Sequence, residues 1–347
     1  MNFKKTTLKE FRNLKGLLID LRSPDEYYKG HMPNSINIPL FNNDERAFIG
    51  KKYKNAGREK AVFEGLKIVE KKFDQLIGDI VSENKKYINK TKSPLMSSQL
   101  KFYCARGGMR SISISWLLEK IGYKSFKLEG GYKSYRNWVL NSFQDDRNIT
   151  LIGGKTGTGK TKILKNLMSH NYQVIDLEYL ANHRGSSFGG LGMTCQPSNE
   201  QFENLLAEKL LRFSKSKTIY IEAESANIGS CRIPNELFKQ MKNAKRIEII
   251  QSKKNRISEL ISTYSVFPDN ELKNSVKKIS KRLGPQRTKK AIEAIGSKNW
   301  EDVCNAVLDY YDKCYDYELA NNLKVSIIDI QDKKENEIIE LITKEEN

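Results

Sequence analysis

The motif Gly-x-x-x-x-Gly-Lys-Thr at residues 154–161 restricts the fold of this chain more than any other feature. The apolar segment ITLIG precedes the motif, and a segment compatible with a helix follows it. In this strand–loop–helix context the motif forms a loop whose backbone N–H groups surround a di- or triphosphate. The motif therefore predicts an α/β domain with a parallel sheet and a phosphate-binding loop.

The residue types of this loop suggest how it binds phosphate. Lys160 neutralises the phosphates, and Thr161 can reach a Mg²⁺ ion. Mg²⁺ is therefore the one cofactor that the sequence suggests, and we expect no tightly bound cofactor. The chain has no Asn-Lys-x-Asp guanine-reading signature, so the ligand need not be a nucleotide. The predicted diphosphate-binding residues are Gly154, Lys155, Thr156, Gly157, Thr158, Gly159, Lys160 and Thr161.

Further strand candidates follow the phosphate loop, namely YQVIDL, TIYIEA and RIEIIQ, and helical segments separate them. One of these helices begins after Ser198, where Gln201 completes a capping-box pattern. The strand TIYIEA ends in acidic residues, of which Glu222 is the first candidate for a metal ligand and Glu224 the second. Acidic residues are common at strand ends, so a role without a metal is equally open.

A polar, glycine-rich loop, LANHRGSSFGGLG, occupies residues 180–192. Such a loop loses much conformational entropy on ordering unless a ligand holds it. Arg184 can bind phosphate, and Phe188 can stack on a base or contact an apolar tail. The alternative is a flexible surface loop. The predicted residues of this site are His183, Arg184, Gly185, Ser186, Ser187 and Phe188.

The N-terminal half contains a cysteine in the run FYCARGGMRS, between the strand candidate LKFY and a helical segment. The glycines let backbone N–H groups converge on one point, and the helix N-terminus adds positive potential. Together with the arginines this favours the thiolate of Cys104, which can attack sulfur, selenium or phosphorus. A buried structural cysteine is the alternative. The predicted anion-binding residues are Arg106, Gly107, Gly108 and Arg110.

The strand candidates LLIDL, INIPL, LKFY and SFKLEG alternate with helical segments in this half, which predicts a second parallel sheet. From about residue 255 onward the pattern is helical, basic and rich in tyrosine, and its last residues read as a frayed helix.

The charge of the chain suggests its partner. Lys and Arg number 60 and Asp and Glu 42, which gives a net charge of +18 and favours a polyanion such as nucleic acid. The five cysteines form no Cys-x-x-Cys pair, which is typical of a reduced, cytoplasmic protein. The N-terminus does not read as a signal peptide, and no apolar run approaches the roughly 20 residues of a membrane helix. We therefore expect no membrane association.

Three segments of the N-terminal half resemble the rhodanese pattern: DLRSPDEYYKGHMPNSINIP at 20–39, YCARGGMRS, and GYKSFKLEGGYKSYRNW. Rhodaneses carry sulfur or selenium on the loop cysteine. The resemblance implies structural roles for Asp20, Arg22 and Glu26, and a turn role for His31. The loop from Cys104 to Arg110 is one residue longer than in common sulfurtransferases. Longer loops are a feature of rhodanese-like phosphatases, so the substrate is expected to bring its own phosphate.

The combination of both halves resembles the bacterial tRNA 2-selenouridine synthase family over about residues 15–260. Supporting segments include ERAFIGKKYKNAGREKA, YCARGGMRS, GKTGTGKT, DLEYLANHRGSSFG, QPSNEQFENLL and IEAESANIGSCRIP. The resemblance implies an α/β protein with a rhodanese-like parallel-sheet domain at 1–138, a linker at 139–148 and a P-loop NTPase-like parallel-sheet domain at 149–260. The helical C-terminal region at 261–347 is predicted from the residue pattern alone, because no motif of the family extends into it.

The activity that this resemblance implies is the replacement of sulfur by selenium in wobble 2-thiouridine of tRNA. Geranyl diphosphate at the phosphate loop first S-geranylates the tRNA, and selenophosphate at the cysteine loop then supplies selenium. In this scheme Cys104 attacks selenium and carries it, Arg106 and Arg110 hold the phosphate, and Arg184 with its neighbours forms the alkylation site. We expect a monomer.

Three other functions remain open from the sequence. The first is an ATP-dependent RNA sulfurtransferase, in which the phosphate loop activates an RNA carbonyl. The second is a rhodanese-type phosphatase, suggested by the loop length. The third is an RNA-binding scaffold without catalysis, in which Cys104 and Lys160 are dispensable.

Overall fold

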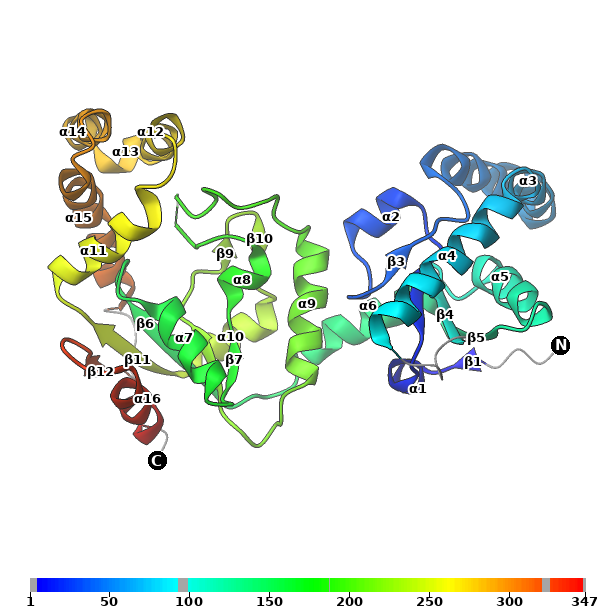
Figure 1. Cartoon of the computed structure of the whole chain (residues 1–347), viewed down its shortest axis with the longest axis horizontal. Coiled ribbons are helices and arrows are strands. Elements are labelled where there is room, and N and C mark those ends of the chain that lie inside the picture. The colour runs from blue at the N-terminus through cyan, green and yellow to red at the C-terminus, as the bar shows by residue number, and fades with distance from the viewer. Residues whose placement is uncertain (1–4, 93–98, 187, 320–324, 346–347) are drawn as a thin grey trace. The chain divides into compact units, whose positions relative to one another are not determined.

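The computed structural model describes residues 5–92, 99–186, 188–319 and 325–345 of the chain (Figure 1). The chain forms two compact units, Met1–Asn141 and Ser142–Asn347. Each unit contains a five-stranded sheet in which all paired strands are parallel. Within the described ranges, no helix is long and apolar enough to cross a membrane.

The sheet of the first unit has the strand order β1-β5-β4-β2-β3. The strands are β1 (Lys5–Thr6), β2 (Leu17–Asp20), β3 (Ile36–Asn37), β4 (Gln99–Tyr103) and β5 (Lys124–Leu128). Its helices are α1 (Leu8–Asn13), α2 (Pro24–Lys29), α3 (Asn43–Glu70), α4 (Phe73–Thr91), α5 (Met109–Lys120) and α6 (Gly131–Ser142). Apolar side chains of β2, β4, α4 and α5 form one buried cluster. The central strand β4 therefore presents its carboxyl end, where Cys104 lies, on a rigid support.

The sheet of the second unit has the order β12-β11-β6-β8-β7. Its strands are β6 (Ile149–Gly154), β7 (Gln173–Ile175), β8 (Ile219–Glu222), β11 (Lys245–Ile250) and β12 (Val325–Asp329). A short antiparallel pair, β9 (Asn227–Ile228) with β10 (Cys231–Arg232), lies outside this sheet. The first helices are α7 (Lys160–Ser169), α8 (Leu177–Ala181), α9 (Asn199–Leu211) and α10 (Asn235–Asn243). The side chain of Ser198 caps α9 by accepting from the Gln201 amide.

The C-terminal helices are α11 (Lys253–Tyr264), α12 (Asp269–Lys278), α13 (Ser280–Leu283), α14 (Pro285–Gly296), α15 (Trp300–Leu319) and α16 (Glu335–Lys344). Figure 1 shows α11 to α15, coloured yellow to brown, gathered in one group. Their apolar side chains form a buried cluster that also includes Phe188 and Leu191 of the glycine-rich loop. This contact joins the helical region to a predicted site.

The predicted fold class is confirmed, including the helices at the C-terminus. One strand was not expected there: β12 pairs with β11, because its β-branched residues suit a pleated, half-buried surface. The last helix, expected to be frayed, instead buries Ile338, Ile339 and Ile342 and contacts α7. The turn-rich stretch after β2 contains the short helix α2, which begins with a capping box between Ser23 and Glu26.

Candidate active sites

Cys104 lies directly after β4, at the start of the loop that leads into α5. The residue is 2% exposed, and its Sγ lies 3.3 Å from Ser111 Oγ in the first turn of α5. Ser111 also donates to the Gly108 carbonyl, at 3.1 Å. A hydroxyl in this position can accept from a thiol or donate to a thiolate. The first N–H groups of α5 have no partner within the helix and lie at its positive end, as anion binding requires.

The Gly-Gly turn at 130–131 supports the cysteine loop, residues 104–110, through backbone hydrogen bonds. Tyr132 N–H donates to the Cys104 carbonyl at 2.8 Å, and Lys133 N–H to the Ala105 carbonyl at 3.0 Å. Gly131 has φ +59°, and a Cβ there would lie 2.2 Å from the Cys104 carbonyl oxygen. Only glycine fits this position, so the turn fixes the backbone on which Cys104 is carried.

The two arginines of the loop have different surroundings. Arg110 is part-buried and pairs with Glu26 of α2, with 3.1 Å between Nη1 and Oε2. Burial raises the pKa of Glu26, but the charge and hydrogen bond of Arg110 outweigh it, so the pKa is lowered and Glu26 stays ionised. Arg106 is exposed, and we find no ion pair to it among the described residues. Arg106 can therefore turn toward an anion, whereas Arg110 is held in place by Glu26.

Asp20 and Arg22 form a buried ion pair beneath this loop, with 2.7 Å between Arg22 Nη2 and Asp20 Oδ2. Arg22 also donates to the Gly30 carbonyl and lies over the Tyr132 ring. Neither side chain is open to a substrate, in line with the structural roles expected. His31 stacks on Tyr27, and burial lowers its pKa, so it remains a neutral turn residue.

In the second unit, residues 154–161 form the turn between the buried strand β6 and the first turn of α7. Lys160 Nζ donates to the Gly154 carbonyl at 2.7 Å, which folds the ammonium group over the loop. Thr158 Oγ1 donates to the Lys155 carbonyl at 2.8 Å and closes the turn internally. Thr161, half-buried, follows Lys160 on α7. This is the geometry expected of a phosphate-binding loop.

Side chains of the C-terminal helices α11 and α15 contact the phosphate loop and fix its backbone. Arg256 Nε donates to the Thr156 carbonyl at 2.8 Å, while its guanidinium pairs with Asp312 of α15 at 2.6 Å. Tyr315 of α15 accepts from the Gly154 N–H. The Lys155 side chain pairs with Asp316 at 2.8 Å. Lys155 is therefore engaged by α15, whereas Lys160 is held by the Gly154 carbonyl within the loop itself.

A cluster of three carboxylates lies beside the phosphate loop. Ligand atoms of Glu178, Glu222 and Glu224 are within 4.8 Å of one another. Burial and the charge of Glu224 raise the pKa of Glu178 to about 8, whereas Lys160 and Arg184 oppose this shift. Glu222 is fully buried at the end of β8, and burial followed by repulsion from Glu178 raises its pKa strongly. Glu222 Oε2 has no hydrogen-bond partner among the described residues.

The glycine-rich loop adopts a hydrogen-bonded turn next to these carboxylates. Arg184 N–H donates to the Gly189 carbonyl, and Arg184 Nη1 donates to the Leu191 carbonyl, both at 3.0 Å. Gly185 has φ +68°, and a Cβ there would lie 2.6 Å from Glu178 Oε1. The loop therefore places Arg184 within electrostatic range of Glu178. Ser187, predicted as part of this site, lies outside the described residues.

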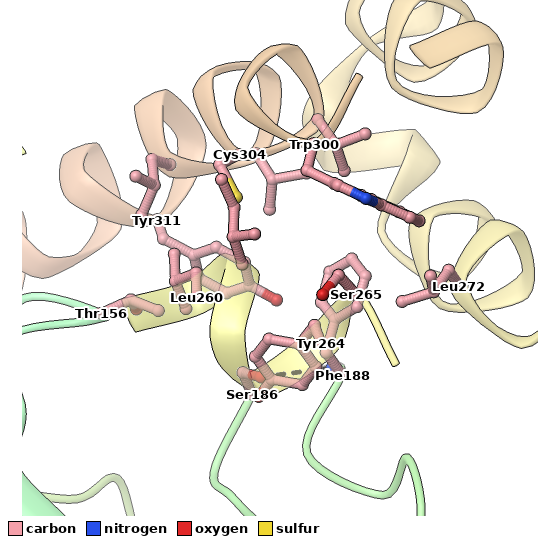
Figure 2. A pocket seen from close by; sticks show the side chains of 14 residues that line it. Thr156, Ser186, Phe188, Leu260, Tyr264, Ser265, Leu272, Trp300, Cys304 and Tyr311 are labelled. Carbon is pink, nitrogen blue, oxygen red and sulfur yellow. Dashed lines mark hydrogen bonds between the residues drawn. The ribbon is translucent and has the colours of Figure 1, made fainter. Parts of the chain in front are cut away.

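The remaining predicted residues of this loop differ in their surroundings. Ser186 and Phe188 line an apolar pocket that also contacts Thr156 of the phosphate loop (Figure 2). Burial lowers the pKa of His183, and its Nδ1 is buried without a hydrogen-bond partner in the described part of the chain. His183 is therefore neutral, and it is not part of the pocket lining.

Sequence reasoning missed three residues that the fold brings to these sites, namely Ser111, Glu178 and Arg256. It assigned Glu26 a structural role but did not predict its ion pair with Arg110. Glu178 belongs to the quoted segment DLEYLANHRG, so an acidic residue ahead of the glycine-rich loop was a usable signal. Arg256 offered no signal, because its contact with the phosphate loop spans 100 residues.

Comparison with known proteins identifies the family of this chain, which carries both loops. A model described as the tRNA 2-selenouridine synthase AAA domain matches residues 147–347, and a rhodanese-like domain model matches residues 5–137. A tRNA 2-selenouridine synthase of Sulfurovum sp. (strain NBC37-1) is 34% identical over 341 residues, which cover 88% of this chain and 89% of the relative.

Two further relatives carry the same name. That of Marinobacter nauticus is 32% identical over 341 residues, covering 87% of this chain and 88% of the relative. That of Nitrosomonas europaea is 33% identical over 254 residues, covering 71% of this chain and 63% of the relative. With the cysteine loop and the phosphate loop both formed, the chain belongs to the tRNA 2-selenouridine synthase family.

Proposed function

We propose that this protein replaces the sulfur of 2-thiouridine at the tRNA wobble position by selenium. It uses geranyl diphosphate to activate the sulfur and selenophosphate to supply selenium, and it acts as a cytoplasmic monomer. The observation that supports this most is the presence, in one chain, of two glycine-containing loops that each join a buried strand to the N-terminus of a helix. One loop carries Cys104, the proposed nucleophile, and the other carries Lys160.

In the first step, the thiocarbonyl sulfur of the tRNA attacks C1 of geranyl diphosphate. The carbon–oxygen bond breaks, diphosphate leaves with the electron pair, and the uracil ring loses its N3 proton. Lys160 and the amides of residues 155–159 stabilise the charge that develops on the diphosphate. Arg184, in the adjoining loop, lies within electrostatic range of Glu178, as Lys160 does, and would be a second cation for the departing group.

In the second step, we propose that the Cys104 thiolate attacks phosphorus of selenophosphate. The phosphorus–selenium bond breaks, hydrogen selenide leaves, and a phosphocysteine forms that water then hydrolyses to phosphate. Attack on selenium would expel phosphorus at the oxidation level of phosphite, and phosphate release would then need an oxidant. Attack on phosphorus needs none, and it suits a loop that resembles those of rhodanese-like phosphatases.

The selenide then adds to C2 of the S-geranylated uridine and expels geranylthiol, while N3 regains a proton. Because the geranyl group turns a thiocarbonyl into a thioether, sulfur can leave as a thiolate. Arg106 and Arg110 would hold the phosphate oxygens of selenophosphate, and Glu26 keeps Arg110 oriented. The net charge of +18 provides attraction to the tRNA backbone, which should weaken as salt is raised.

The carboxylate cluster fits a divalent cation. Glu222 Oε2 is buried without a hydrogen-bond partner among the described residues. Burial and the charges of the neighbouring carboxylates raise the pKa values of Glu178 and Glu222, and a cation would relieve this repulsion. We propose that Glu178, Glu222 and Glu224 hold Mg²⁺. When bound, the ion would offset the negative charge of the diphosphate.

Because of the acidic cluster, the free energy of unfolding should depend on pH when a chelator keeps the cluster free of metal. An unfolded glutamate ionises near pH 4.5, whereas folded Glu178 keeps its proton to about pH 8. Between these values the folded state binds the extra proton, so the free energy of unfolding falls as pH rises, by up to about 1.4 kcal/mol per pH unit. Glu178→Gln should flatten this fall in thermal unfolding midpoints.

Repeating these unfolding measurements with Mg²⁺ in place of the chelator distinguishes cation binding from protonation of Glu178. At about pH 8, Mg²⁺ should raise the unfolding midpoint of the parent more than that of Glu178→Gln. Equal pH slopes for parent and variant, together with equal responses to Mg²⁺, would contradict the proposed cation site.

The substrate assignment is tested with two preparations of one tRNA, with and without the 2-thio group. With both donors present, nucleoside mass spectrometry should detect 2-selenouridine only from the thiolated tRNA. Selenation of the unthiolated tRNA, or of neither, would overturn the proposed function.

A further inference from the structure

An apolar pocket lies in the second unit between α11, α12 and α15 and the two loops of the phosphate site (Figure 2). Its volume is about 560 Å³, including the part that is open to solvent. The helices supply most of its wall, including Leu260, Leu272, Trp300, Val303, Cys304 and Val307. All of these residues except Leu260 belong to the C-terminal region at 261–347, to which the sequence assigned no site.

The pocket is continuous with the phosphate-binding loop. Thr156 of that loop lines it, as do Ser186 and Phe188 of the glycine-rich loop. In Figure 2 Thr156 lies at the left of the pocket, and Leu272 and Trp300 lie at the right. The Thr156 carbonyl is fixed by Arg256, which in turn is fixed by Asp312 of α15. A ligand with phosphates in the loop can therefore extend an attached group into the pocket.

The chemistry of the wall selects the attached group. The wall is made almost entirely of apolar atoms. The Tyr264 hydroxyl is already hydrogen-bonded to Ser186, and burial raises the pKa of the Cys304 thiol to about 11, which keeps it neutral. A nucleobase there would lose its hydrogen bonds to water without replacement, which is costly, whereas a hydrocarbon chain loses none. The pocket therefore favours a hydrocarbon over a base.

We propose that α11, α12 and α15 form the hydrocarbon-binding part of the phosphate site and hold the isoprenoid chain of an allylic diphosphate. Leu272 and Trp300, on the side away from Thr156, limit the length of that chain. This assignment rests on the proposed function for its ligand class, and it adds the residues that select the ligand.

The test compares binding of geranyl diphosphate and inorganic diphosphate to the full-length protein by titration calorimetry. The parent should bind geranyl diphosphate at least about 10-fold more tightly, because chain burial adds to phosphate binding. Cys304→Trp fills the pocket and should remove this advantage while leaving inorganic diphosphate affinity within about 2-fold. Cys314→Trp, at an exposed position of the same helix, is the matched control and should behave like the parent.

A second variant enlarges the pocket instead of filling it. Trp300→Ala should shift preference from geranyl toward farnesyl diphosphate by about 10-fold or more, and this holds even if Cys304→Trp fails to fold. Equal affinity of the parent for geranyl and inorganic diphosphate would overturn the proposal. So would an unchanged chain-length preference in Trp300→Ala, or ATP binding that Cys304→Trp abolishes.

These binding results are independent of the transfer reaction. Tight, pocket-dependent geranyl diphosphate binding without transfer to thiolated tRNA would refute the proposed function and leave the pocket assignment standing. Transfer that persists in Cys304→Trp with unchanged affinity would refute the pocket assignment alone.

Discussion

Replacing Lys160 with alanine should lower the rate of geranyl transfer to thiolated tRNA by about 100- to 1,000-fold. Its ammonium group lies over the phosphate loop, at 2.7 Å from the Gly154 carbonyl. Lys155, the other lysine of the loop, is paired with Asp316 and cannot substitute without breaking that ion pair. The rate is measured as S-geranylated nucleoside formed from geranyl diphosphate in single-turnover reactions.

Two comparisons make this result specific to the diphosphate. Lys165→Ala removes an exposed lysine from the same helix, α7, and should leave the rate within about 2-fold of the parent, as expected for a surface charge. Purified S-geranyl tRNA given selenophosphate should still be selenated by Lys160→Ala, because the proposed second step takes place at Cys104 and not at the phosphate loop. Geranyl transfer at the parent rate in Lys160→Ala would refute the role of the loop.

Replacing Cys104 with alanine should reduce selenation of S-geranyl tRNA by about 1,000-fold or more, as removal of a catalytic nucleophile does. In the proposed second step Cys104, whose Sγ lies 3.3 Å from Ser111 Oγ, is the group that releases selenide from selenophosphate. Geranyl transfer should persist in this variant, so S-geranylated tRNA should accumulate when both donors are supplied. The readout is the ratio of geranylated to selenated nucleosides.

The chemistry at Cys104 can be observed on the protein itself. With selenophosphate and no tRNA, intact-protein mass spectrometry should show a phosphoryl adduct on the parent and none on Cys104→Ala. Cys195→Ala, at an exposed position, is the matched control and should keep the adduct. A selenium adduct in place of the phosphoryl group would show that selenium, not phosphorus, is attacked. Full selenation by Cys104→Ala would remove this residue from catalysis.

Much of the fold could be predicted from the sequence because local patterns determine it. Apolar runs such as LLIDL and ITLIGG became β2 and β6, and the motif at 154–161 formed the expected turn. The same patterns could have identified α2, since Ser-Pro-Asp-Glu at 23–26 combines an N-cap, a proline in the first turn and a capping box.

The tertiary contacts of the sites could not be predicted in this way. Glu26 and Arg110 meet across 84 residues, and Arg256 meets Thr156 across 100. Such pairs depend on strand order and helix packing, which a local pattern does not encode. The pocket could not be predicted for the same reason, since helix packing forms it. Helical spacing predicts α11 and α15, but it does not show that Leu260 and Cys304 line one cavity beside the phosphate loop.

The most direct measurement for the two-site, two-step function uses one thiolated tRNA and three incubations: geranyl diphosphate alone, selenophosphate alone, and both together. Nucleoside mass spectrometry should show only S-geranyl-2-thiouridine in the first, unchanged 2-thiouridine in the second, and 2-selenouridine in the third. Selenophosphate added to isolated S-geranyl tRNA should also give 2-selenouridine. Formation of 2-selenouridine from selenophosphate alone would contradict the requirement for geranylation and for the phosphate loop in this reaction.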